Sequence, residues 1–118
     1  MKRFQVLMLL LSFFYAAHSA HAHALLEQAT PKVGSIVKIS PKEVRLKFSE
    51  PLEARFSKVE VRSAAGAVIA VGNADRNKSH ELAARIPALA PGKYQVIWKV
   101  ISIDSHATAG NFGFEVRP

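Results

Sequence analysis

The stretch "EVRLKFS" at residues 43–49 has the pattern that decides the fold. Val44, Leu46 and Phe48 alternate with charged residues, so all three side chains project to one face of an extended chain. A period of two predicts a β-strand with one face buried and the other in solvent.

The same alternation returns along the chain, with turn residues between the runs. The runs are "SKVEVRS" at 57–63, "AVIAVG" at 67–72, "LAARIP" at 82–87, "YQVIWKV" at 94–100 and "FGFEV" at 112–116. The polar segment "NADRNKSHE" at 73–81 is expected to be a loop. About seven short strands predict an all-β fold, a small antiparallel Greek-key β-sandwich or barrel.

The segment before residue 23 has the layout of a secretory signal peptide. Lys2 and Arg3 precede the apolar run "VLMLLLSFFYAA" at 6–17, and small and polar residues follow it. A membrane anchor is the alternative, but the run is shorter than the roughly 20 apolar residues that a spanning helix needs. We therefore expect residues 1–22 to be removed on export.

The cleavage point decides which residue becomes the amino terminus. Signal peptidase prefers small residues at the third and first positions before the cut, and Ala20 and Ala22 meet that preference. The expected mature chain therefore starts at His23, and a chain that starts at His21 is the alternative.

Residues 23–118 are predicted to form one exported domain with a single core. The sequence has no cysteine, so it offers neither disulfides nor thiolate ligands. The full chain carries a formal net charge of +7, but its basic residues are spread along the predicted strands. This spread, together with export, argues against nucleic acid as a partner. It favours a solvated face that could meet an anionic membrane surface or an acidic partner.

His23 would be an unusual residue at a new amino terminus. Its α-amine and its ring Nδ1 could bind one metal ion together in a six-membered chelate ring. Unperturbed pKa values near 7.7–8.0 for an α-amine and 6.5 for imidazole mean that both groups lose their protons near neutral pH. Cleavage would thus create a bidentate metal ligand.

A second pair of candidate ligands lies in "ISIDSHATAG" near the carboxyl end. Asp104 and His106 are two residues apart and would project to the same side of an extended segment. With His23 they would supply three nitrogens and one oxygen. His80 stands beside Lys78 and Glu81 and is expected to be an exposed bystander.

This donor set indicates which metal would bind. Nitrogen ligands with a carboxylate in a tetragonal arrangement favour Cu(II) or Ni(II), with copper bound more tightly, and zinc could take the same donors in a tetrahedron. Met1 and Met8 are the only methionines and would leave with the signal peptide. Because Cu(I) prefers sulfur ligands, Cu(II) is the expected ion.

Three stretches resemble the CopC family of periplasmic copper-binding proteins: "HALLEQATP" at 23–31, "VRLKFSEPLEARFSKVEV" at 44–61 and "LAPGKYQVIWKVISIDSHATAGNFGFEV" at 89–116. The resemblance covers nearly the whole predicted mature chain. It combines an amino-terminal His, Phe-Ser-Glu, Gly-x-Tyr followed by Trp, Asp-x-His and a closing Gly-x-Phe.

The resemblance implies a cupredoxin-like or immunoglobulin-like β-barrel that binds one Cu(II) per chain. The ligands would be the amine and ring of His23, with Asp104 and His106. The acid of Phe-Ser-Glu falls on Glu50, which would hydrogen-bond the amine or a ligand ring and orient it. Some relatives have a methionine-rich Cu(I) segment, and nothing in this sequence corresponds to it.

The expected function is that of a periplasmic, monomeric Cu(II)-binding protein, not an enzyme and not membrane-spanning after cleavage. It would buffer copper or pass it to an inner-membrane partner resembling CopD. One alternative is a copper-dependent oxidative enzyme, because lytic polysaccharide monooxygenases also bind copper with an amino-terminal histidine. Another is a structural β module that binds no metal.

Overall fold

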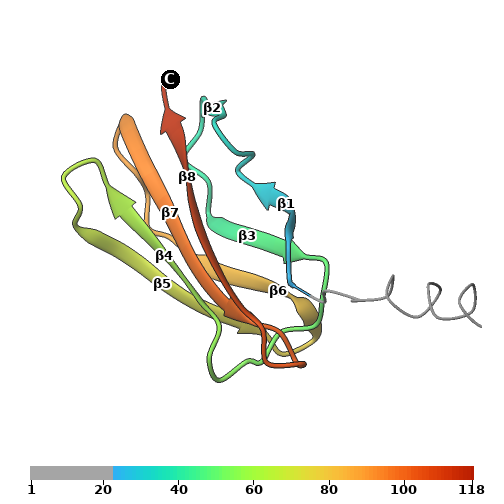
Figure 1. The fold of residues 1–118 in the computed structure, drawn as a ribbon. Coiled ribbons are helices and arrows are strands. Elements are labelled where there is room, and N and C mark those ends of the chain that lie inside the picture. Colours follow the sequence, from blue (N-terminus) through green and yellow to red (C-terminus); the bar gives the residue numbers. More distant parts are fainter. Residues whose placement is uncertain (1–22) are drawn as a thin grey trace, which may run out of the picture.

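The computed structural model describes residues 23–118, and all regular secondary structure in these residues is β-strand (Figure 1). The strands are β1 (Leu26–Thr30), β2 (Ile36–Val37), β3 (Glu43–Phe48), β4 (Lys58–Ser63), β5 (Val68–Asp75), β6 (Lys78–Arg85), β7 (Gly92–Ile101) and β8 (Ala107–Val116). The predicted signal peptide lies outside the described residues. Within residues 23–118, no helix is long and apolar enough to cross a membrane.

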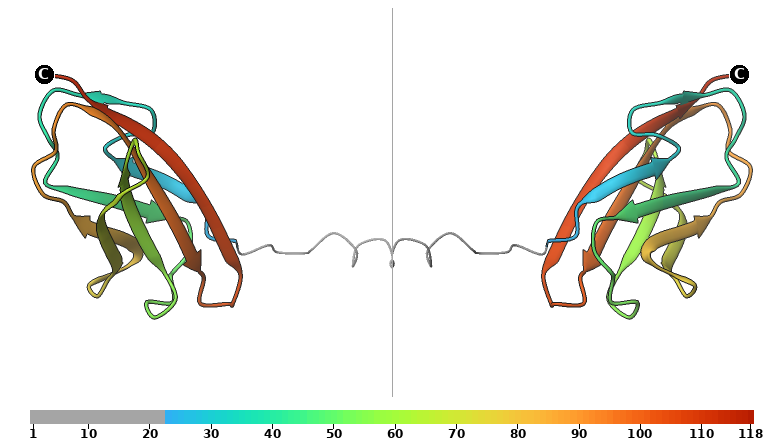
Figure 2. Two further views of the ribbon diagram at one scale, coloured as in Figure 1. Left: turned by 90° about the vertical axis from the view of Figure 1, so that its left-hand side faces the viewer. Right: turned by 90° about the vertical axis from the view of Figure 1, so that its right-hand side faces the viewer.

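The strands form one 8-stranded sheet in the order β1-β3-β6-β5-β4-β7-β8-β2. Its neighbours are antiparallel except for the short β2, which runs parallel to β8. Hairpins connect β4, β5 and β6, and the following strand β7 returns to lie beside β4, which is a Greek key. The sheet curls so that β1 and β3 face β7 and β8 (Figures 1 and 2). The all-β sandwich prediction is therefore confirmed.

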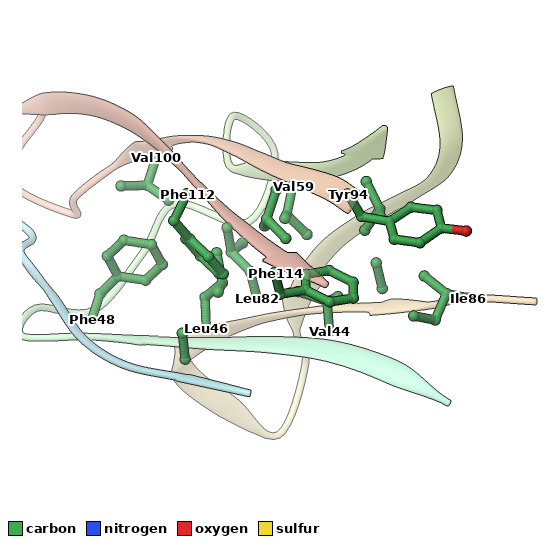
Figure 3. Close-up of a cluster of buried hydrophobic side chains, with 14 of the residues drawn as sticks. Val44, Leu46, Phe48, Val59, Leu82, Ile86, Tyr94, Val100, Phe112 and Phe114 are labelled. Atoms are coloured by element: carbon green, nitrogen blue, oxygen red, sulfur yellow. The ribbon is translucent and has the colours of Figure 1, made fainter. Parts of the chain in front are cut away.

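The core lies between these two layers and is built from the alternating positions of the strands. Val44, Leu46 and Phe48 of β3 are fully buried, and Phe112 and Phe114 of β8 are nearly so. Figure 3 shows these side chains pointing toward one another. Burying side chains of this size contributes about 1.5–3 kcal/mol each, so the packing can hold a domain without disulfides.

The expected loop at 73–81 is wrong, because most of these residues extend two strands. β5 continues to Asp75 and β6 begins at Lys78, with a tight turn between them. The backbone N–H of Asn77 donates to Asp75 Oδ1 at 2.8 Å and stabilises the turn. Asp75 and Glu81 face Arg45 on β3 at 3.0 and 3.8 Å. The polar residues are therefore strand residues whose charges pair across the outer face.

Candidate metal centre

His23 precedes β1 and is held in place by the residues that follow it. Ala24 is fully buried, and its carbonyl oxygen accepts a hydrogen bond from Thr108 Oγ1 at 2.9 Å. The N–H of Leu25 donates to Ser49 Oγ at 2.8 Å, and that hydroxyl lies 3.3 Å from the carbonyl oxygen of His23. The segment is thus fixed between the end of β3 and the start of β8.

The other two predicted ligands lie in the turn that connects β7 to β8. The extended segment expected for Asp104 and His106 is wrong, because the chain reverses here and Ser105 adopts a φ of 73°. The buried Ser102 closes the turn, since its N–H donates to the carbonyl oxygen of His106 at 2.9 Å. A turn therefore achieves the proximity that was predicted for a strand.

The hydroxyl of Ser102 also organises the side chains of the turn. It donates to Asp104 Oδ1 and accepts from the backbone N–H of His106 at 3.2 Å. Asp104 Oδ2 then lies 3.3 Å from His106 Nδ1. Each oxygen of the carboxylate thus has a partner, and the carboxylate and the imidazole are held at the same point of the turn.

The structure brings the amino-terminal segment and this turn together. The rings of His23 and His106 have centroids 4.8 Å apart at an interplanar angle of 52°. Two donors bound to one ion at about 2.0–2.2 Å lie roughly 2.8–3.5 Å from each other. The 3.3 Å between Asp104 Oδ2 and His106 Nδ1 falls in this range. The same contact also suits a carboxylate that orients the imidazole of a metal ligand.

The carboxylate of Asp104 carries a negative charge that can attract a cation. The hydrogen bond from Ser102 is the main cause that lowers the pKa of Asp104, and the nearby His106 lowers it further. Asp104 is therefore ionised at neutral pH and remains so into the acid range. A negative oxygen beside the His106 imidazole, which in turn lies beside the exposed ring of His23, is a suitable arrangement for a divalent metal ion.

The side chains alone do not complete a metal-binding group. Among residues 23–118, no three side chains of His, Cys, Asp or Glu converge closely enough to hold an ion. In this structure His23 is still joined to Ala22 by a peptide bond, so its nitrogen is an amide. The predicted set gains its remaining donor, the α-amine, only when that bond is cut.

Glu50 is half-buried and is the second residue after the end of β3. In the described part of the chain, no hydrogen bond or ion pair joins it to Asp104 or His106. Its neighbour Ser49 makes the contacts with the amino-terminal segment instead. The role expected for Glu50 stays a prediction, to be judged on the cleaved chain.

The sequence did not point to the hydroxyl groups of Ser49, Ser102 and Thr108, which position the site. His80 lies on β6, and its Nδ1 is 3.1 Å from Ser79 Oγ. Within the described chain, no ion pair joins His80 to the Asp104 and His106 of the turn. His80 is half-buried rather than exposed, and its expected role as a bystander stays a prediction.

Fold and site define a small β-sandwich protein with a histidine and carboxylate cluster at one end. A CopC domain model matches residues 26–117, nearly the whole described chain. The chain therefore belongs to the CopC family, as the resemblance predicted. The family binds copper, and it includes copper resistance and copper transport proteins rather than enzymes.

Three curated relatives show how widely the domain is used. Protein YobA of Escherichia coli K12 is 33% identical over 102 residues, which cover 84% of this chain and 82% of that protein. Copper resistance protein C of Escherichia coli is 32% identical over 111 residues, 86% of each chain. Copper transport protein CutJ of Bacillus subtilis is 25% identical over 113 residues, 93% of this chain but 21% of CutJ.

Solved structures show the same fold. CopC from Methylosinus trichosporium OB3b aligns with a TM-score of 0.77 at 32% identity, covering 81% of this chain and 95% of that one. PcoC, described as a methionine-rich copper resistance protein from Escherichia coli, aligns with a TM-score of 0.72 at 27% identity, covering 81% and 100%. Both likenesses support the sandwich assignment.

Proposed function

We propose that residues 23–118 are the mature form of a periplasmic protein that binds one Cu(II) ion per chain. The ligands are the α-amine and ring of His23, with Asp104 and His106. One observation carries this proposal: the 4.8 Å approach of the two histidine rings, which joins residues from opposite ends of the domain beside an ionised carboxylate.

The chain itself supplies the means of capture and release. The segment that bears His23 is anchored by Ala24, and the turn is closed by Ser102, so little ordering is needed when the ion binds. The amine and both imidazoles bind the ion in their neutral forms, so protons compete with the ion for these nitrogens. Release is therefore favoured by protonation or by ligand exchange with a partner.

The oxidation state follows from the available donors. Residues 23–118 contain neither methionine nor cysteine, the ligands that Cu(I) prefers. The chain differs in this respect from a methionine-rich relative such as PcoC. The proposed cargo is therefore Cu(II), and a shuttle between two oxidation states is not part of the proposal.

Transport is the expected context of this binding. Residues 1–22 are proposed to direct export and then to be removed, so that the mature chain is not anchored. The likeness of the chain to a portion of a much longer copper transport protein supports delivery to a transporter. The proposed partner is an inner-membrane protein of the CopD type.

The cleavage point is tested by the intact mass of the exported protein. The mass expected is that of residues 23–118, and a chain that starts at His21 would contradict the ligand set. Titration of that protein with Cu(II), followed by electron paramagnetic resonance, should give one tetragonal site with nitrogen donors. Saturation at any other ratio would contradict the proposed stoichiometry.

Two histidine variants separate the site from a general affinity for metal. His106→Ala removes a proposed ligand and should weaken Cu(II) binding by more than the ~10–100-fold that loss of an outer hydrogen-bond partner costs. His80→Ala is the matched control and should leave the affinity unchanged. Equal losses in both variants, measured by competition with a chromogenic chelator, would count against the site.

A further inference from the structure

Large apolar side chains are exposed around the candidate metal centre. Leu25 is 63% exposed, Phe56 60% and Ile103 58%. Leu25 lies two residues after His23, and Ile103 precedes Asp104 in the turn. Exposing several large apolar groups beside one site is unfavourable unless another surface covers them.

The loop between β3 and β4 joins these three residues into one rim. Its Ser49 exchanges hydrogen bonds with Leu25, and its Pro51 carbonyl accepts from the N–H of Ile103 at 3.1 Å. Glu53, near Phe56, donates its N–H to the carbonyl oxygen of Ile101 at 2.8 Å. The β3–β4 loop and the β7–β8 turn thus lie at the same end of the sandwich (Figures 1 and 2).

A shallow groove continues the rim and is positively charged. It has a volume of about 280 Å³, and its lining includes Phe56, Ile101, Arg55, Lys58 and Lys99. Lys58 and Lys99 stand directly opposite each other on β4 and β7. Lys58 is paired with a neighbouring glutamate at 3.4 Å. In the described chain Arg55 and Lys99 form no ion pair, so their charges are available to a partner.

We propose that this rim and groove dock a second protein, which presents carboxylates to Arg55 and Lys99 and an apolar side chain to the groove beside Phe56. The proposal rests on the proposed function, since an ion passes by ligand exchange only when the two sites are in contact. A protein surface with that chemistry is complementary in both charge and shape.

A bilayer fits these features less well than a protein does. Binding to anionic lipid is typical of clusters of about 4–8 basic residues. Here the groove offers Arg55 and Lys99, with Lys58 already paired. A concave surface also suits an inserted side chain better than a flat lipid layer does. The membrane therefore becomes an alternative outcome of the test.

The test places a photo-crosslinking amino acid, p-benzoylphenylalanine, at Phe56 of the full-length protein in living cells of its host. The control position is Val71 on β5, which is 56% exposed. We expect position 56 to crosslink one protein at a peptide that contains Asp or Glu, and position 71 to crosslink much less. Equal labelling at both positions would overturn the proposal.

Charge reversal supplies the second arm. Arg55→Glu with Lys99→Glu should reduce the crosslink at position 56 by roughly tenfold or more, because like charges that face each other across an interface repel. An unchanged crosslink would contradict the charge argument. A crosslink to phospholipid, or co-sedimentation with phosphatidylglycerol vesicles that reversal abolishes, would replace the protein partner with a membrane. A crosslink to a second copy of the chain would overturn the proposal as well.

The same proteins separate this inference from the proposed function. Isolated residues 23–118 with both reversals should bind Cu(II) as the unchanged protein does, because neither residue belongs to the ligand set. If the unchanged protein bound no Cu(II), the proposed function would fail. The crosslinking pattern would still decide whether the rim is a docking surface.

Discussion

At the scale of single residues, small hydroxyl groups place the candidate ligands. Ser49 fixes the amino-terminal segment, Thr108 anchors Ala24, and Ser102 holds both Asp104 and the backbone of His106. Such partners commonly matter for a metal centre almost as much as the ligands do, because they fix ligand orientation and charge. The site can therefore be weakened without touching a ligand.

Ser102→Ala is the sharpest test of this idea. It removes the hydrogen bond that chiefly lowers the pKa of Asp104 and the acceptor for the N–H of His106. We expect Cu(II) affinity to fall by ~10–100-fold, the usual cost of losing such a partner. Binding should also fail at a higher pH than in the unchanged protein, because Asp104 would take up a proton more readily.

Ser57→Ala is the matched control for that measurement. Ser57 is as buried as Ser102, and its hydroxyl accepts from the N–H of Ile101, the last residue of β7 before Ser102, at 3.1 Å. This variant should lose stability but keep its Cu(II) affinity in competition titrations. If Ser57→Ala lost as much affinity as Ser102→Ala, the effect would belong to the strand and not to the site.

Adding one glycine before His23 tests the role of the amine. The added residue turns the His23 nitrogen into an amide and moves the new amine away from the ring. We expect affinity for Cu(II) to fall by more than the ~10–100-fold expected for Ser102→Ala, with an unchanged circular dichroism spectrum. Unchanged affinity would show that His23 binds through its ring alone or does not bind.

The sequence could nominate His23, Asp104 and His106 because their chemistry is scarce in this chain and each has a local signature. His23 follows a cleavage signal, and the other two residues are close in sequence. The hydroxyl groups have no such signature, since a serine near a turn is ordinary and its partner is set by tertiary contacts. Ser49 lies 26 residues from His23, the residue whose carbonyl it contacts.

At the scale of elements, the alternating apolar positions predicted the core strands because burial acts on one face at a time. The alternating pattern did not predict the hairpin of β5 and β6. Asp75 and Glu81 are strand residues whose charges pair with Arg45 on β3. The turn at Ser105 was missed for a related reason. Its closing partner, Ser102, looks like a continuation of the strand in sequence alone.

The packing of β7 against β8 depends on a glycine. Gly110 stands opposite Trp98, and a Cβ atom there would lie 2.4 Å from Trp98 Cζ2. Trp98 is itself held edge-on against Phe48, with ring centroids 5.1 Å apart. Gly110→Ala should therefore destabilise the domain by about 1–3 kcal/mol, the usual cost of overpacking. Urea denaturation would measure the loss.

Gly113→Ala on the same strand is the control. Its added Cβ would meet only the carbonyl oxygen of Tyr94, at an ordinary 3.4 Å. We expect little change in the urea midpoint, and we expect Trp98→Leu to recover part of the loss in Gly110→Ala. If both glycine variants lost the same stability, strand propensity would explain the result and the contact with Trp98 would not.

At the scale of the whole molecule, the candidate site exists only because the sandwich brings the two ends of the domain together. His23 precedes the first strand and His106 the last, so no local pattern could place their rings 4.8 Å apart. The family resemblance predicted the pairing, and the residues alone left it open. The proposed site therefore depends on the fold, and conditions that loosen the sandwich are expected to weaken the proposed Cu(II) binding as well.

Acid is such a condition, because one ion network joins three strands. Arg45 on β3 contacts Glu43 at 3.1 Å, Asp75 on β5 at 3.0 Å and Glu81 on β6 at 3.8 Å. The backbone N–H of Asn77 and the guanidinium of Arg45 lower the pKa of Asp75. The carboxylates of Glu43 and Asp75 in turn raise the pKa of Arg45. The folded state thus prefers an ionised Asp75.

The sign of the pH dependence follows from linkage. Because the pKa of Asp75 is lower in the folded state than the roughly 3.9 of an unfolded chain, its stabilising effect is complete above that value. The effect is lost as the pH falls through the folded pKa. Asp75→Asn removes the titration, so the metal-free variant should lose less stability between pH 7 and pH 3 than the unchanged protein.

Glu27→Gln, at an exposed β1 carboxylate without an ion pair in the described chain, should follow the unchanged protein. Urea midpoints at both pH values decide the matter, and parallel losses in Asp75→Asn and the unchanged protein would place the acid sensitivity elsewhere.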